Sequence, residues 1–103
     1  MTPLLLASEK GHLEAVQLLL QEELAGRIDV NQARTKDGAT PLLLASQHGH
    51  LEVVCRLLEA EGINVNRSRT SDGATPLLVA AQHGHLEVAE RLLHTSTAGG
   101  LTT

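Results

Sequence analysis

Residues 37–54 read DGATPLLLASQHGHLEVV, and this stretch decides the fold because the chain repeats it. It returns at residues 72–89 as DGATPLLVAAQHGHLEVA, and a more divergent copy at residues 2–16 reads TPLLLASEKGHLEAV. The Thr-Pro pairs of successive copies are 38 and 35 residues apart. Periods of this length are typical of arrays in which each repeat is one supersecondary unit. The sequence therefore predicts a short repeat array.

Each copy predicts two short helices joined by a turn. Thr40 is a suitable N-cap, because its hydroxyl can accept a backbone N–H of the first turn, and Pro41 suits the first helical position. Gly49 provides the left-handed conformation that commonly follows a helix. Apolar residues then recur at helical spacing along one stripe of a second helix: Leu51, Val54, Leu57 and Leu58. The first helix is apolar on nearly all sides, so we expect it to be buried between neighbouring repeats.

The order Thr-Pro-Leu-x-x-Ala, Gly-His-Leu-Glu, Leu-Leu and Val-Asn resembles the ankyrin repeat. The pattern is present at residues 2–31 and 40–66, and at residues 75–93 without the final Val-Asn. The resemblance covers nearly the whole chain. It implies an all-α fold, an ankyrin-repeat solenoid of stacked helix-turn-helix hairpins with polar β-turn finger loops.

One departure from the family pattern concerns the histidine that usually follows Thr-Pro-Leu. The chain has leucine there in every copy, at Leu5, Leu43 and Leu78. The polar contact that this histidine commonly makes between repeats is therefore absent. We expect Leu43 to be buried instead against the first helices of adjacent repeats.

The repeats predict a single ankyrin-repeat domain over residues 1–103. Its expected parts are repeat 1 over about 1–34, which lacks its first turn, repeat 2 over about 35–69, repeat 3 over about 70–95, and a frayed tail over 96–103. The second helix of repeat 1 should run from about Leu13 past Leu20, until Gly26 can cap it. Polar loops with an Asp-Gly turn signal separate the repeats at residues 32–39 and 67–74.

Composition and charge narrow the possible partners and location. The chain has 103 residues, no Phe, Tyr or Trp, and a net charge of −4. Without aromatic rings to stack on bases, and with an acidic balance, no nucleic-acid partner is expected. Cys55 is the single cysteine, so nothing requires an oxidising compartment. We see neither a signal peptide nor a membrane-spanning stretch, and predict an intracellular, cytoplasmic protein with no membrane partner, leaving the nucleus open.

Residues with catalytic or metal-binding chemistry do not form a convergent set. His48, His50, His83 and His85 suggest a metal site, but zinc needs several converging ligands, and Gly-His belongs to the family pattern. Cys55 would act as a nucleophile only with a base held against it, and its helical phase places it on the outer side of its helix. We therefore predict no enzymatic activity, no catalytic or metal-binding residues and no cofactor.

The resemblance to ankyrin repeats implies a protein–protein interaction module that binds a protein partner through the concave face of the stacked repeats. Binding residues are expected at the finger tips, the finger bases and the ends of the first helices. Small Ala39 and Ala74 should leave room between the fingers for a partner's side chain. The predicted protein-binding residues are Glu9, Lys10, Arg34, Lys36, Asp37, Ala39, Gln47, His48, Arg69, Ser71, Asp72, Ala74, Gln82 and His83.

Other classes of function stay open on the sequence. One is a structural or engineered repeat scaffold without a native partner, and another is a metal-binding or enzymatic role. Neither terminal repeat has an obvious polar outer face of the kind that usually caps a solenoid. Self-association through the uncapped ends is therefore a further alternative.

Overall fold

The computed structural model describes residues 1–24 and 26–101, with side chains described for residues 1–22 and 26–95. The helices are α1 (Pro3–Lys10), α2 (Leu13–Leu24), α3 (Pro41–Gln47), α4 (Leu51–Leu58), α5 (Pro76–Gln82) and α6 (Leu86–Leu101). Among the described residues there is no strand, so the predicted all-α class is confirmed. The helices pair in chain order into repeat 1 (α1 and α2), repeat 2 (α3 and α4) and repeat 3 (α5 and α6).

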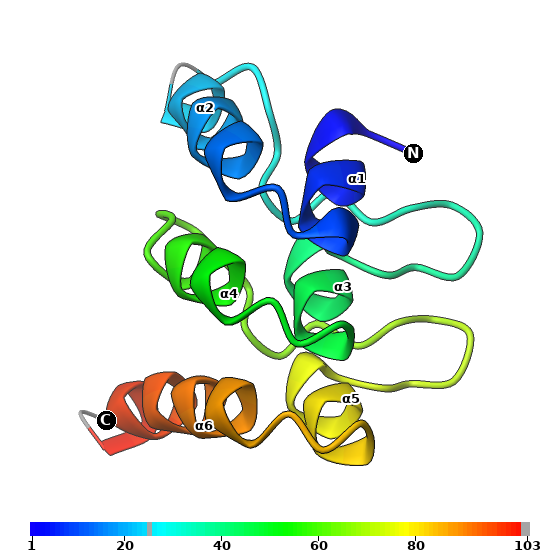
Figure 1. Cartoon of the computed structure of the whole chain (residues 1–103), viewed down its shortest axis with the longest axis vertical. Helices are drawn as coiled ribbons and strands as arrows, with labels where there is room; N and C mark the ends of the chain where they lie inside the picture. Colours follow the sequence, from blue (N-terminus) through cyan, green and yellow to red (C-terminus); the bar gives the residue numbers. More distant parts are fainter. Residues whose placement is uncertain (25, 102–103) are drawn as a thin grey trace.

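The helices stack in two layers (Figure 1). The inner helices α1, α3 and α5 form one layer, and the outer helices α2, α4 and α6 form the other. Two long loops extend from the inner layer on the side away from the outer helices, and these are the fingers at residues 32–39 and 67–74. Each repeat therefore contacts its neighbour through both helices, and the two fingers lie one above the other.

The predicted helix boundaries rest on caps that recur in every repeat. Thr2, Thr40 and Thr75 each accept, through the side-chain oxygen, the backbone N–H of the leucine three residues later at 3.2 Å. A proline follows each cap at the start of the helix. Gly49 and Gly84 have φ angles of 72° and 74°, the left-handed conformation expected at these helix ends. The threonine caps and glycine turns are thus confirmed.

Buried side chains form two clusters. The larger fills the space between the inner and outer layers, with Leu4, Val16, Leu42, Val53, Val54, Leu57, Val88 and Leu92 among its members. The smaller lies between successive inner helices and the fingers, and contains Leu5, Ala39, Leu43, Leu44, Ala74 and Val79. Leu43 is fully buried, as predicted, whereas Leu78 is 47% exposed because no described repeat packs on that side of α5.

The first outer helix ends as the sequence predicts. It runs to Leu24, and Gly26 adopts a φ of 78° just beyond it. The backbone N–H of Arg27 then donates to the carbonyl of Glu22 at 3.0 Å. This bond satisfies one of the carbonyls that a helix end leaves without a partner.

The last outer helix differs from the expectation. We predicted a frayed tail over residues 96–103, but α6 continues to Leu101, and residues 102–103 lie outside the described part. The threonines and serine after His94 are weak helix formers, which favours an early stop. No proline interrupts the segment and the first glycine is Gly99, so the helix has no strong local signal to end sooner.

Candidate binding surface

The predicted binding residues lie on one side of the molecule, here called the finger-side surface, which comprises the fingers and the C-terminal ends of the inner helices. Most of them are exposed: Lys10, Lys36, His48, Ser71, Asp72, Gln82 and His83. Others are half-buried, because they contact one another: Glu9, Arg34, Asp37, Gln47 and Arg69. The half-buried residues form two clusters of the same design.

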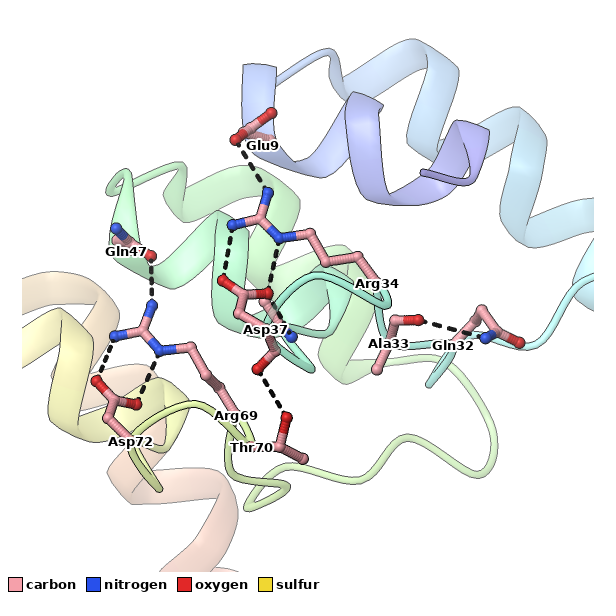
Figure 2. A network of polar contacts seen from close by, with 10 residues as sticks. Glu9, Gln32, Ala33, Arg34, Asp37, Gln47, Arg69, Thr70 and Asp72 are labelled. Carbon is pink, nitrogen blue, oxygen red and sulfur yellow. Dashed lines mark hydrogen bonds and ion pairs between the residues drawn. The ribbon is translucent and has the colours of Figure 1, made fainter.

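The first cluster centres on Arg34 at the base of the first finger (Figure 2). Its Nε and Nη2 donate to the two carboxylate oxygens of Asp37 at 2.8 and 2.9 Å. Its Nη1 lies 3.6 Å from Oε2 of Glu9 at the end of α1. A paired, planar contact of this kind fixes the arginine more firmly than a single ion pair does. Arg34 therefore ties its finger to the inner helix of repeat 1.

The second cluster repeats this arrangement one repeat further along (Figure 2). Arg69 donates from Nε and Nη2 to the carboxylate of Asp72, both at 2.9 Å. Its Nη1 donates to Oε1 of Gln47 at 3.3 Å, where the first cluster has Glu9. Arg34 and Arg69 are both among the predicted protein-binding residues. The structure instead engages much of each guanidinium within the chain.

The ion pairs change the acid–base properties of these groups. Hydrogen bonding from Arg34 lowers the pKa of Asp37 from 3.8 to about 2. Hydrogen bonding from Arg69 likewise lowers the pKa of Asp72. The same bonds raise the pKa of each arginine. Both pairs are therefore fully ionised at neutral pH.

The two fingers are also bonded to each other. Thr70 donates from Oγ1 to the backbone carbonyl of Asp37 at 3.0 Å, and the backbone N–H of Ser71 donates to the same carbonyl at 3.1 Å. Gly38 has a φ of 79°, and a Cβ there would lie 2.5 Å from Oγ1 of Thr70. The close approach of the fingers therefore requires glycine at this position. No pattern in the sequence indicates that Thr70 forms a contact between repeats.

The expected role of two small residues is wrong. Ala39 and Ala74 were predicted to leave room for a partner's side chain between the fingers, but they are only 0% and 2% exposed. Both pack in the smaller buried cluster beneath the fingers. A polar loop gave no sign that one of its residues would turn inward. The two alanines therefore stabilise the packing of the fingers and are not part of the exposed surface.

The histidines of the Gly-His motifs join neighbouring repeats. His50 bonds through Nε2 to the carbonyl of Glu9 at 3.0 Å, and His85 bonds in the same way to the carbonyl of Gln47. These contacts were not predicted from the sequence, although the glycine of each motif is a signal for them. A Cβ on Gly11 would lie 2.6 Å from the His50 ring, so only glycine leaves the ring room to cross to the preceding helix.

His48 and His83 lie beside these bridging rings. The ring centroids of His48 and His50 are 6.0 Å apart, and those of His83 and His85 are 6.1 Å apart. Over the described ranges, no group of three or more His, Cys, Asp or Glu side chains is placed to hold a metal ion. Cys55 is half-buried on α4.

Two lysines complete the finger-side surface. Lys10 at the end of α1 and Lys36 at the tip of the first finger are both exposed. Neither forms an ion pair within the described residues, in contrast to Arg34 and Arg69. Arg67 in the second finger is also exposed and forms no ion pair among the described residues, although its Nη1 donates to the backbone carbonyl of Asn31 at 2.9 Å. The two lysines are therefore the cations of this surface whose side chains have no described bond within the chain.

The fold is that of a helical-repeat solenoid built from hairpins and fingers. A family model for ankyrin repeats matches residues 1–69 and 24–99 and finds three copies, so the chain belongs to the ankyrin repeat family. A search of curated proteins gave no significant match. Ankyrin repeats are generally protein-interaction modules. In the described part of the chain, no helix combines the length and apolar character needed to cross a bilayer.

Proposed function

We propose that the protein is an interaction module that binds a protein partner through the finger-side surface, the concave face of the repeat stack, without catalysis. The observation that supports this most directly is that some polar residues of this surface are bonded within the chain, whereas others are exposed and available to a partner. The arginines are held by Asp37 and Asp72 and keep the fingers in place. Lys10, Lys36, His48 and His83 remain exposed beside them.

The chemistry of this surface favours a partner segment that carries carboxylates. Lys10 and Lys36 provide exposed ammonium groups that no described acidic side chain neutralises. Because the fingers are braced by ion pairs and cross-finger hydrogen bonds, little conformational entropy is lost when a partner docks on them. A rigid polar surface with unpaired cations fits an acidic peptide segment, whose charges also accelerate the encounter.

The test is a selection of random peptides displayed on phage against the immobilised 103-residue chain. We expect the selected peptides to be enriched in Asp and Glu. Their binding should be lost in the double variant Lys10→Glu with Lys36→Glu. The matched control is Arg56→Glu with Arg91→Glu, which reverses the same number of charges on exposed residues of the outer helices α4 and α6.

The control pair also tests the main competing location. Arg56 lines an open hollow between α2 and the end of α4, together with Gln17, Leu20 and Glu59. Peptides that bind the lysine variant normally but no longer bind the arginine variant would place recognition on the outer helices. That outcome would contradict the proposed function. Unchanged melting temperatures for both variants are required before either result is interpreted.

A further inference from the structure

Both junctions between repeats bury the same pair of apolar side chains. Leu5 on α1 and Leu44 on α3 belong to the smaller cluster, and so do Leu43 on α3 and Val79 on α5. In the alignment of the repeats, Leu5 and Leu43 are equivalent, and so are Leu44 and Val79. All four are at most 1% exposed. Each junction therefore joins a leucine of one repeat to an aliphatic residue one position later in the next repeat.

The two end faces of the stack carry unpaired members of this same contact. Leu78 on α5 is the third equivalent of Leu5 and Leu43, and it is 47% exposed. Leu6 on α1 is the third equivalent of Leu44 and Val79, and it is 46% exposed. The α1–α2 face and the α5–α6 face lie at opposite ends of the stack (Figure 1). At the α5–α6 face Leu78 therefore lacks the aliphatic partner that Leu44 and Val79 provide at the internal junctions, and Leu6 at the α1–α2 face is such a residue without a leucine to cover it.

The contact between a glycine of one repeat and a histidine of the next also occurs at both internal junctions, and each end face carries one unpaired member of it. His50 lies against Gly11 and bonds to the carbonyl of Glu9, while His85 lies against Gly49 and bonds to the carbonyl of Gln47. At the α5–α6 face no described atom lies within 4 Å of a Cβ built on Gly84. At the α1–α2 face the equivalent histidine, His12, is exposed.

We propose that copies of this chain associate head to tail, with the α5–α6 face of one copy packed on the α1–α2 face of the next. Leu6 of the second copy would then cover Leu78, and its His12 would cover Gly84 and donate to the carbonyl of Gln82. This junction continues the pattern of the two internal ones. At both internal junctions an arginine of the following finger contacts the preceding inner helix, as Arg34 contacts Glu9 and Arg69 contacts Gln47. The junction between copies lacks this contact, so it is weaker than the internal ones.

A head-to-tail contact joins two different surfaces, so each added copy leaves a new free end and growth does not stop at a dimer. Sedimentation velocity of the 103-residue chain should therefore show a weight-average mass that rises steadily over about a hundredfold range of concentration. Leu6→Glu and Leu78→Glu should each abolish this rise, because each variant removes one of the two faces. The substituted positions are half-exposed, and circular dichroism melts establish that the variants fold.

Mixing the two variants provides the decisive measurement. The Leu6→Glu chain keeps its α5–α6 face and the Leu78→Glu chain keeps its α1–α2 face. Together they should form a one-to-one dimer that cannot grow, although neither associates alone. His12→Ala in the Leu78→Glu chain should weaken this dimer about fivefold, since it removes one hydrogen bond and its ring contact.

Arg56→Glu is the control, because Arg56 is exposed on α4, the outer helix of the middle repeat, which forms neither end face. It should leave association unchanged. Monomers at every concentration would overturn the proposal. So would a Leu6→Glu chain that dimerises alone, which would show like faces pairing, or a mixture of the two variants that does not associate.

Discussion

A single carboxylate, that of Asp37, holds several parts of the first finger at once. It accepts two bonds from Arg34 and a third from the backbone N–H of Ala39 at 3.1 Å. The backbone carbonyl of Asp37 also accepts a hydrogen bond from the hydroxyl of Thr70 in the next finger. Asp72 occupies the equivalent place but is 54% exposed, against 16% for Asp37. The two aspartates therefore form a natural comparison between a covered and an open ion pair.

This difference predicts a specific response to acid. The pKa of Asp37 is lowered to about 2 by Arg34, so the folded state holds this proton less tightly than the unfolded chain. The stabilisation is present above about pH 4 and is lost as the pH falls towards 2. In urea titrations, Asp37→Asn should remove about 1 kcal/mol of the pH dependence in this window. Asp72→Asn should remove less, and an equal or larger effect would contradict this account.

The buried hydroxyl of Ser46 predicts a stabilising substitution. Its side-chain oxygen is buried, and no described atom offers it a hydrogen bond. Repeat 3 has Ala81 at the equivalent position. Ser46→Ala should raise the free energy of unfolding by about 0.5–1 kcal/mol, because an unsatisfied buried polar group is removed without changing the shape. Ala81→Ser, at an exposed position, should be neutral. A loss of stability in Ser46→Ala would reveal a partner for the hydroxyl.

Sequence patterns predicted some single residues well and others poorly. Burial of Leu43 followed from repetition, because apolar residues at equivalent places need a common apolar environment. The inward position of Ala39 did not follow, since alanine is compatible with both a loop surface and a tight contact. Arg34 and Arg69 were predicted only as binding residues at the finger bases, and their ion pairs within the chain were not foreseen. Their acidic partner lies only three residues away, and spacing alone could not show that a loop would bring Arg34 and Asp37 into a paired contact.

At the scale of elements, the turn between inner and outer helices does two things. It reverses the chain through a glycine with positive φ, and it makes room for the histidine of the next repeat. The caps and helix lengths could be predicted because they depend on residues close in sequence. The histidine contacts span 41 and 38 residues, and their acceptors are backbone carbonyls that no side-chain pattern identifies.

The glycine turns give a matched pair of substitutions. Gly49→Val and Gly84→Val both place a β-branched residue at positive φ, which should cost about 1–3 kcal/mol in each case. Gly49→Val should cost about 1 kcal/mol more, because its side chain collides with the His85 ring, 2.6 Å from the Cβ position. Urea denaturation of both variants measures the difference. Equal losses would mean that the histidine contact adds little to the junction.

At the scale of the whole molecule, repeat 2 is the only one of the described repeats with a neighbour on both sides. Stability in such an array is approximately the sum of the repeats and their junctions. The inner helix α3 should therefore open less often than α1 or α5. A chain of this kind frays from its ends and not uniformly.

Hydrogen exchange can measure this gradient at equivalent amides. Leu44 and Val79 donate to Thr40 and Thr75 through the same capping geometry, each at 3.0 Å. After correction for intrinsic rates, the Leu44 amide should exchange about tenfold more slowly than that of Val79. The Leu6 amide, which donates to Thr2 at 3.1 Å, should resemble Val79. Equal protection at all these positions would show that the three repeats open as one cooperative unit.

The histidine bridges between repeats have a consequence for how such a protein can diversify. His50 and His85 bond to the main-chain carbonyls of residues 9 and 47, which every amino acid possesses. Glu9 and Gln47 can therefore be exchanged for other residues without altering these particular bonds. Their side chains face the finger-side surface and contact Arg34 and Arg69. Selection can change the outward chemistry at these positions while the coupling between neighbouring units is inherited unaltered.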